Sequence, residues 1–372
     1  MKVAAAVLYS PNEALRIEEV ELAPPKDGEV LVRMHAAGVC HSDLHVMKGD
    51  QPMKMPIILG HEGAGMVEEV GKGVKSVEPG DAVIPIWRMS CGMCEYCLGG
   101  RPALCDVGTK MRFTGRMPDG TTRFRNARGD EIKHYAGVST FSEKSTMPEG
   151  AVVKIDRDYS MENAALIGCG VITGYGAVFH AAKVEMGSTV AVFGAGGIGL
   201  NAIQCARLAG ASTIIAIDAF PTKEDYAAQL GATHFINSKE NNPVAAIMDL
   251  TGGLGVDFAI EAVGLPVTVE QSYDVTRKGG TCVVVGIGRP DARAMININS
   301  LVYAEKTLKG SIYGTTRPRI DLPRLIKLAK NGKIELESLL TKTWRLDQIN
   351  EAYAALERGE VARSLILPQQ VS

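Results

Sequence analysis

The residues that could do chemistry gather in two short stretches. Cys91, Cys94, Cys97 and Cys105 fall within fifteen residues in the spacing C-x2-C-x2-C-x7-C. Without an export signal disulfides are not expected, and four thiolates at this spacing predict one closed, tetrahedral zinc site. An iron–sulfur cluster also uses four cysteines and is the alternative. A zinc with four protein ligands is coordinatively full, so this site would fix a loop and do no chemistry.

The second stretch, VCHSDLHVMKGDQPMKMPIILGHEGAG, covers residues 39–65. Cys40 follows an extended apolar segment. His61 and the later Cys169, in ALIGCGVITGYG, lie among glycines, where we expect the chain to turn at the end of a buried element. Two thiolates and one imidazole form the three-ligand set of a catalytic zinc, whose fourth position is open. On spacing alone, a buried apolar cysteine and a hydrogen-bonded histidine stay open as the alternative. Cys205 and Cys282 are interpreted as buried cysteines of that kind.

A glycine motif follows residue 187 in the order strand, turn, helix, strand, acid. Gly194, Gly196 and Gly199 form G-x-G-x-x-G directly after the apolar run Thr189–Phe193, and Asp218 ends the next apolar run. Such a loop lets the backbone and a helix N-terminus approach a pyrophosphate. A carboxylate at 218 can accept hydrogen bonds from ribose hydroxyls, and no arginine follows it to bind a 2′-phosphate. The motif therefore predicts dinucleotide binding, with NAD favoured over NADP.

Two different kinds of domain must position these residues. Alternating strands and helices over 171–312 predict a doubly wound parallel sheet of about six strands, with helices expected after a Thr222 cap and at Asn242. Residues 1–170 have short strands, many glycines and both predicted zinc sites, and form a β-rich domain. The segment 313–372 contains two amphipathic helices and is expected to return to the first domain.

The composition indicates a compact protein that binds small molecules. The 372 residues are 46% hydrophobic, and 40 basic against 42 acidic residues leave a formal net charge of −2. That balance gives no general reason to bind nucleic acid or an anionic membrane. No apolar run approaches the roughly 20 residues of a membrane-spanning helix, and the first residues carry no export signal, so a cytoplasmic location is expected.

Over nearly its whole length the sequence resembles the zinc-dependent medium-chain alcohol dehydrogenases, in particular the long form with a structural-zinc lobe. The motifs that carry the resemblance are GVCHSDLHV, GHEGAG, CGMCEYCLGGRPALC, MPDGTTRF, STFSE, IGCGVITGYG, VFGAGGIGL and GEVARSLIL. The resemblance implies an α/β protein with a GroES-like catalytic domain, a Rossmann domain and the active cleft between them. It also implies two zinc ions per subunit, one catalytic and one structural, NAD as cofactor and a homodimer.

The resemblance assigns catalytic roles to the stretch after residue 39. Zinc on Cys40, His61 and Cys169 would lower the pKa of a bound alcohol, so that hydride can leave for the nicotinamide. Ser42 would accept the proton and His45 would release it to solvent. Two acids are expected around the metal ligands. Asp43 would support His61, and Glu62 would lie behind the ion.

The resemblance also implies cofactor and substrate contacts. His41 and Arg363 are expected on the two sides of the pyrophosphate, and Asp218 and Lys223 at the adenosine ribose. The remaining expected cofactor contacts are Thr173, Gly194, Gly196, Gly197, Ile198, Gly199, Val263, Val285, Ser311 and Tyr313. The expected substrate wall is formed by Trp87, Tyr135, Ala136 and Ile287.

The predicted function is oxidation of primary alcohols, allylic or aromatic ones included, to aldehydes, and the reverse reaction, with hydride transfer to NAD. One alternative is an S-hydroxymethylglutathione dehydrogenase, but that branch has an arginine where this chain has Thr109 and an acid where it has Pro52. A nicotinoprotein with permanently bound cofactor and an inactive scaffold of the same fold are further alternatives. A polyol or sugar dehydrogenase is disfavoured by Trp87.

A basic segment follows the four cysteines. We interpret it as a solvated loop, and an anion-binding or nucleic-acid patch is the alternative. Its basic residues are Lys110, Arg112, Arg116, Arg123, Arg125 and Arg128, with Asp119 the only acid among them.

Overall fold

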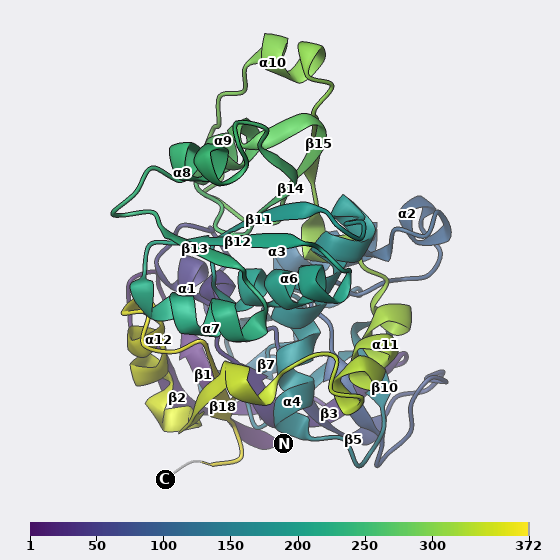
Figure 1. Cartoon of the computed structure of the whole chain (residues 1–372). Coiled ribbons are helices and arrows are strands. Elements are labelled where there is room, and N and C mark those ends of the chain that lie inside the picture. Colours follow the sequence, from purple (N-terminus) through teal and green to yellow (C-terminus); the bar gives the residue numbers. More distant parts are fainter. Residues whose placement is uncertain (371–372) are drawn as a thin grey trace. The chain divides into compact units, whose positions relative to one another are not determined.

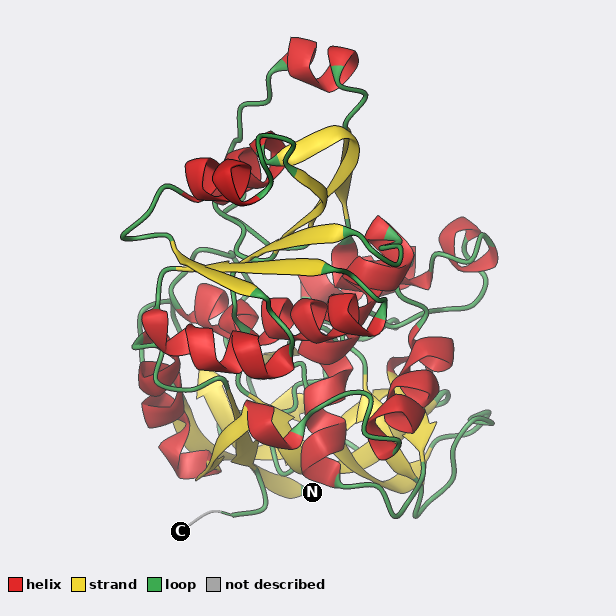
Figure 2. Ribbon diagram, in the orientation of Figure 1, coloured by secondary structure: helices red, strands yellow, loops and turns green. Residues whose placement is uncertain are grey.

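The computed structural model describes residues 1–370 and divides into two compact units (Figures 1 and 2). Of these residues, the first unit comprises Met1–Cys169, Arg317–Lys327 and 336–370, and the second comprises Gly170–Thr316 and Leu328–Glu335. The returning segment predicted for 313–372 is therefore interrupted, because Leu328–Glu335 packs with the second unit.

The first unit contains a closed barrel and a larger, mostly antiparallel sheet. The barrel has the order β1 (Lys2–Leu8), β2 (Arg16–Leu22), β7 (Phe124–Arg125), β8 (Glu131–His134) and β4 (Ile57–Ile58). The sheet has the order β10 (Val152–Ile155), β6 (Ala82–Pro85), β5 (Ala64–Val70), β3 (Glu29–Gly38), β18 (Arg363–Leu367) and β17 (Leu340–Arg345), with β9 (Lys144–Pro148) also paired to β3.

Strand β3 is buried on both faces, and its side chains alternate between two cores. Val30, Val32 and Met34 pack in one apolar cluster, whereas Leu31 packs in another with residues of the barrel. This alternation is the period of a β-strand. Because β3 is fixed from both sides, the residue that follows it, Cys40, has a well-defined position.

Short helices connect the strands of the first unit. Its helices are α1 (His41–Met47), α2 (Glu95–Leu98), α3 (Asp106–Thr114), α4 (Met161–Leu166) and α12 (Ile349–Glu357). Helix α11 (Pro318–Lys330) lies mostly in this unit. Short 3-10 turns lie at Pro102–Leu104, Glu149–Ala151, Glu337–Leu339 and Leu346–Gln348.

The second unit is a six-stranded parallel sheet, as predicted. Its order is β13 (His234–Asn237), β12 (Thr213–Asp218), β11 (Thr189–Phe193), β14 (Val256–Glu261), β15 (Thr276–Val284) and β16 (Thr307–Gly310). The order reverses beside β11, as in dinucleotide-binding folds. Figure 1 shows α6 (Gly197–Leu208) and α7 (Glu224–Leu230) on one side of the sheet and α8 (Pro243–Leu250) and α9 (Pro266–Asp274) on the other. The unit also contains α10 (Ile298–Tyr303) and 3-10 turns at Pro221–Lys223 and Ile312–Thr315.

The two helix starts predicted in this unit have different outcomes. The Asn242 side chain accepts hydrogen bonds from the N–H groups of Val244 and Ala245, so it caps α8 as predicted. The predicted Thr222 cap is wrong, because Pro221 opens a 3-10 turn that contains Thr222 and α7 starts only after Lys223.

One helical stretch, Met161–Ala182, corrects two predictions. It runs through α4, a π-helical turn (Ile167–Val171), α5 (Ile172–Gly176) and a second π-helical turn (Ala177–Ala182). Its 22 residues are long and apolar enough to cross a membrane, contrary to the prediction that no run approaches that length, but 89% of its most apolar window is buried, as in a core helix. Cys169 lies inside this helix, so the turn predicted there is wrong. The glycines beside it allow a π-helical turn, a distortion common at functional sites.

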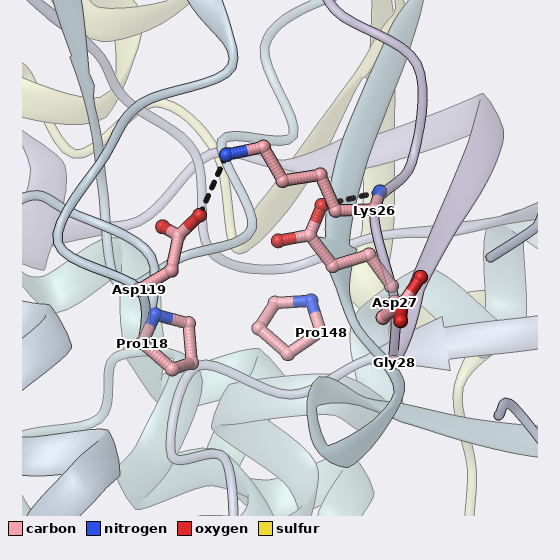
Figure 3. Close-up of a pocket in the computed structure, with 7 residues that line it drawn as sticks. Lys26, Asp27, Gly28, Pro118, Asp119 and Pro148 are labelled. Carbon is pink, nitrogen blue, oxygen red and sulfur yellow. Dashed lines mark hydrogen bonds and ion pairs between the residues drawn. The ribbon is translucent and has the colours of Figure 1, made fainter. Parts of the chain in front are cut away.

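The basic segment is not a solvated loop throughout, which corrects a further interpretation. Arg123 is buried and its guanidinium pairs with Glu29 at 2.5 Å and Asp119 at 3.0 Å. Asp119 also pairs with Lys26 at 2.8 Å, on one side of a surface hollow of about 440 Å³ (Figure 3). Arg112 is likewise buried, on α3.

The buried histidine of the barrel, His134, gives the fold a pH dependence. Burial and the charges of Arg123 and Lys133 lower its pKa to about 3, and its Nε2 accepts the Arg123 N–H at 3.0 Å. Between about pH 6.5 and about pH 3 the unfolded chain binds a proton at this residue that the folded chain does not, so stability falls as the pH falls.

The amide oxygen of His134→Gln can accept the same hydrogen bond but does not titrate. Between about pH 6.5 and pH 4 we therefore expect the unfolding free energy of this variant to fall by about 3 kcal/mol less than that of the wild type. Urea denaturation across that range measures the difference. The exposed His234→Gln serves as the control and should follow the wild type. Parallel pH curves for His134→Gln and the wild type would contradict the assignment.

Candidate metal centres and dinucleotide site

The structure brings each predicted set of metal ligands together. The ligand atoms of Cys91, Cys94, Cys97 and Cys105 all lie within 4.8 Å of one another. Those of Cys40, His61 and Cys169 do so too, and a carboxylate oxygen of Glu62 joins them. All the cysteines are free thiols.

The four-cysteine loop holds its sulfurs with backbone groups. The Cys91 N–H donates to the Cys105 Sγ and the Cys94 N–H to the Cys91 Sγ, both at 3.3 Å. Backbone N–H groups of Asp106 and Cys97 lower the pKa of Cys94 to about 6, whereas burial raises the pKa of Cys97 to about 12. Four thiols this close cannot all ionise unless a cation neutralises them, so the donor set fits a thiolate-bound metal such as zinc.

Three different elements of the first unit supply the second cluster. Cys40 lies at the N-terminus of α1, directly after β3, and His61 lies in the loop between β4 and β5. Cys169 comes from the π-helical turn, at the end of the first unit's longest segment. Residues separated by more than a hundred positions therefore meet at one point.

The imidazole of His61 is oriented by a buried carboxylate. Its Nδ1 lies 3.0 Å from the Asp43 Oδ2, and the other oxygen of Asp43 accepts the Gly60 N–H at 2.9 Å. Both side chains are buried. The arrangement leaves the Nε2 of His61 for the cluster, which is how carboxylates orient metal-bound histidines.

The electrostatics of this cluster favour a cation. The Cys169 thiol and the His61 charge hold the pKa of Cys40 well below its usual range against the effect of burial. Although burial opposes it, Asp43 and Cys40 raise the pKa of His61 well above its usual range. The pKa of Cys169 is raised by its contact with Cys40 and by burial. A divalent cation would relieve this concentration of negative charge, so the residues fit a zinc ion.

Glu62 and Arg363 form a buried ion pair beside these ligands. The Arg363 guanidinium donates to the Glu62 carboxylate, and both residues are buried. Burial raises the pKa of Glu62 to about 8 despite that charge. Gly38 makes room for the pair, because a Cβ there would overlap the Glu62 carboxylate. The contact of Arg363 with a pyrophosphate stays a prediction.

The predicted proton-relay residues share the first turns of α1. Ser42 and His45 are three residues apart, so they lie on one face of the helix. The Nδ1 of His45 lies 3.3 Å from the Asp50 Oδ2, and its side chain is 36% exposed. His41 is exposed at the start of the same helix.

The rings of Trp87 and Tyr135, here called the aromatic wall, stand edge-on to His61. Their centroids lie 6.1 Å and 5.6 Å from that of the imidazole. The Arg112 guanidinium carbon lies over both rings, 5.3 Å and 5.0 Å from their centroids. The prediction missed Arg112, although Gly108, Met111 and Arg112 share the buried face of α3 at helical spacing. Ala136 is buried next to Tyr135.

The glycine loop of the second unit has the geometry its spacing predicts. Gly194 has φ +93°, and a Cβ on Gly199 would overlap the Gly194 carbonyl oxygen, whereas a Cβ on Gly196 would meet nothing within 4 Å. The Asp218 carboxylate accepts the N–H groups of Ala195 at 2.7 Å and Phe220 at 2.9 Å, so it is tied to this loop.

A buried polar atom adds to the fit of a cofactor in this unit. The Thr173 Oγ is buried and has no hydrogen-bond partner among residues 1–370. Gly197 begins α6, and Ile198 follows it in a partly buried position. Of the other predicted contacts, Lys223, Val285, Ser311 and Tyr313 are buried, and Val263 and Ile287 are exposed.

Comparison with known proteins identifies the family. Residues 26–157 match the alcohol dehydrogenase GroES-like domain and residues 197–331 match the zinc-binding dehydrogenase domain. The chain is 41% identical over 370 residues to the NDMA-dependent alcohol dehydrogenase of Amycolatopsis methanolica, covering 99% of both chains. It belongs to the zinc-dependent medium-chain alcohol dehydrogenases.

Two further relatives of this alcohol dehydrogenase family differ in name. The S-(hydroxymethyl)glutathione dehydrogenase of Escherichia coli is 41% identical over 369 residues, which is 98% of this chain and 100% of the relative. The crystal structure of benzyl alcohol dehydrogenase from Acinetobacter calcoaceticus has a TM-score of 0.93 at 33% identity and 99% coverage of both chains. The predicted fold of a GroES-like domain and a parallel Rossmann sheet is thus confirmed.

The glycine loop of this dehydrogenase yields a stability prediction. We expect Gly199→Ala to lower the unfolding free energy by about 1–3 kcal/mol, because its Cβ would overlap a backbone oxygen. Gly196→Ala should stay within about 0.5 kcal/mol of the wild type, because its Cβ would face open space. Urea denaturation of the two variants decides the matter, and equal losses would contradict the loop geometry.

Proposed function

We propose that the protein oxidises primary alcohols, allylic or aromatic ones included, to aldehydes, and catalyses the reverse reaction, with NAD as hydride carrier. The observation that carries the proposal is the cluster of the partly buried Cys40 with the buried His61 and Cys169, next to the aromatic wall. A zinc ion held by these three side chains would supply a Lewis acid for the alcohol, and NAD would take up the hydride.

The residues of α1 then handle the proton. The Ser42 hydroxyl receives it from the alcohol, and His45 releases it to solvent, to which its ring is partly exposed. Asp50 holds the His45 ring by its Nδ1. Asp43 acts as a positioning residue for His61. Glu62 offers the cluster an additional oxygen, and its pairing with Arg363 limits how far that carboxylate can move.

The dinucleotide is proposed to bind the glycine loop of the second unit. Its pyrophosphate would take the space in front of Gly196, and Asp218 would accept ribose hydroxyls, which disfavours NADP. His41 and Arg363 are proposed as further pyrophosphate contacts, Lys223 as a contact of the adenosine ribose and Thr173 as a contact of the nicotinamide. Other proposed contacts are Gly194, Gly197, Ile198, Gly199, Val263, Val285, Ser311 and Tyr313.

A second candidate is a nicotinoprotein, which keeps its cofactor and passes electrons to another acceptor. The relative from Amycolatopsis methanolica is named for its dependence on NDMA, which favours this candidate. A glutathione-linked activity is disfavoured, because Thr109 accepts a hydrogen bond from Arg88 and Pro52 is exposed and carries no charge.

A homodimer is proposed through the edge strand of the parallel sheet. β16 is the last strand on one side, and this strand and the segment before it expose large apolar side chains. These are Met295, Ile298, Val302, Tyr303 and Leu308. A second copy of the chain would cover them and pair with the open edge. The thiolate ligands are in keeping with a reducing compartment such as the cytoplasm.

Turnover with NAD tests the proposed function. We expect NADH to form from benzyl alcohol, and Ser42→Ala to lower kcat about 100-fold or more, because proton transfer is lost. The exposed His234→Gln is the matched control and should keep wild-type kcat. Zinc-loaded protein that binds NAD but turns over no alcohol would favour the scaffold. Cofactor that survives gel filtration and is reoxidised only by an added acceptor would favour the nicotinoprotein.

Elemental analysis tests the two metal sites separately. We expect about two zinc per chain, and about one in either Cys97→Ser or Cys169→Ser. Cys97→Ser should lower Tm, because the loop loses its cross-link, whereas Cys169→Ser should keep the fold and lose turnover. An active wild-type enzyme with metal only in the four-cysteine loop would overturn the mechanism.

A further inference from the structure

Arg112 is a buried cation without an acidic partner. It lies on α3 and is 8% exposed, and its Nη2 donates a hydrogen bond to the neutral Gln51 Oε1 at 2.9 Å. Among residues 1–370 no carboxylate pairs with it. Burying an unpaired charge is costly, so such groups are normally paired with an anion.

The guanidinium lies one aromatic ring away from the metal cluster. The Trp87 and Tyr135 rings each stand nearly perpendicular to the His61 imidazole, and the guanidinium lies over the same two rings. A substrate whose hydroxyl lies at the cluster and whose body lies along the aromatic wall would therefore bring its far end to Arg112. The Tyr135 centroid lies 5.6 Å from the imidazole centroid and 5.0 Å from the guanidinium carbon, which favours a substrate body of one benzene ring.

The guanidinium of Arg88 adds a second positive charge beside the Trp87 ring. Arg88 lies 5.7 Å from the Trp87 centroid and is already used, because it donates to the carbonyl of Ala103 and to the Thr109 hydroxyl at 2.8 Å and 2.9 Å. Burial, and next the charge of Arg112, lower the pKa of Arg88. An anion placed here would be attracted by both charges.

The N–H groups of Arg112 are available to such an anion. A guanidinium has five N–H donors, and the groups that face this one are the Gln51 amide oxygen and the Tyr135 hydroxyl, so N–H groups remain for an anion. Guanidinium N–H pairs match the two oxygens of a carboxylate.

We propose that Arg112 binds a carboxylate at the far end of the alcohol, so that the preferred substrates are aryl alcohols carrying a carboxylate para to the hydroxymethyl group. This inference rests on the proposed alcohol dehydrogenase activity. The hydroxymethyl group would lose one hydride, which NAD⁺ would accept, and one proton, which would pass through Ser42 and His45 to solvent, and the carboxylate would be unchanged. Arg112 contributes specificity and takes no part in the hydride or proton transfer.

Steady-state kinetics with matched substrates test the proposal. We expect the wild type to prefer 4-(hydroxymethyl)benzoate to 4-methylbenzyl alcohol in kcat/KM, and Arg112→Gln to lose about tenfold or more with the carboxylate only. Arg112→Lys should recover part of the preference, because it keeps the charge. Arg116→Gln, on a partly exposed arginine paired with Glu131, is the matched control and should behave as the wild type.

Binding measured without turnover tests the role of Arg112 separately from the proposed alcohol dehydrogenase activity. Terephthalate and 4-methylbenzoate both carry one carboxylate for the metal, but only terephthalate has a second for Arg112. Calorimetry should show tighter binding of terephthalate to the zinc-loaded wild type and equal binding of both to Arg112→Gln.

Equal affinities and equal kcat/KM in an active wild type would overturn the role of Arg112 while leaving the proposed function intact. The same result is expected if Arg112 only balances the charge of the metal cluster. Loss of all turnover in the wild type, with terephthalate still preferred, would instead overturn the proposed function.

Discussion

The first unit depends on burying more acidic groups at one point than can be ionised together. Cys40, Cys169 and Glu62 present their ligand atoms within 4.8 Å of one another, and Asp43 lies directly behind His61. Without a cation this grouping is unfavourable, as the opposed pKa shifts of the two thiols show. With a divalent cation the same grouping would become a tight site, so a bound metal would stabilise the arrangement of these side chains.

The surrounding elements are shaped to permit this grouping. β3 is packed on both faces and delivers Cys40 to the N-terminus of α1, where the helix dipole favours a thiolate. Gly38 leaves space for the Glu62 carboxylate, and the π-helical turn brings the Cys169 side chain to the cluster from inside a long buried helix. Each of these features is a departure from ordinary packing or regular helix geometry, and the interactions within the ligand cluster offset the free energy that it costs.

Sequence patterns predicted those parts of the molecule that depend on local periodicity. The strand Thr189–Phe193, the acid that ends the next strand and the Asn242 cap are all set by neighbours in the chain. The π-helical position of Cys169 and the burial of Arg112 and Arg123 were missed. The helical spacing of Arg112 with Met111 and Gly108 was a local signal that was overlooked. The positions of Cys169 and Arg123 depend on contacts with distant residues, such as the pairing of Arg123 with Glu29, which no local pattern encodes. Charge alone therefore suggested solvent exposure.

The partner of Arg112 shows how neutral residues can determine specificity. An acid at position 51 would pair with the guanidinium and consume its charge, whereas Gln51 orients it by one hydrogen bond and leaves the charge in place. Thr109 acts in the same way on Arg88. The aromatic wall then shields the guanidinium of Arg112 from water on two sides, which strengthens its attraction for an anion. A carboxylate that enters this site gains more than it would at the surface, and a neutral alcohol leaves the buried charge unpaired, so the discrimination follows from the cost of that unpaired charge.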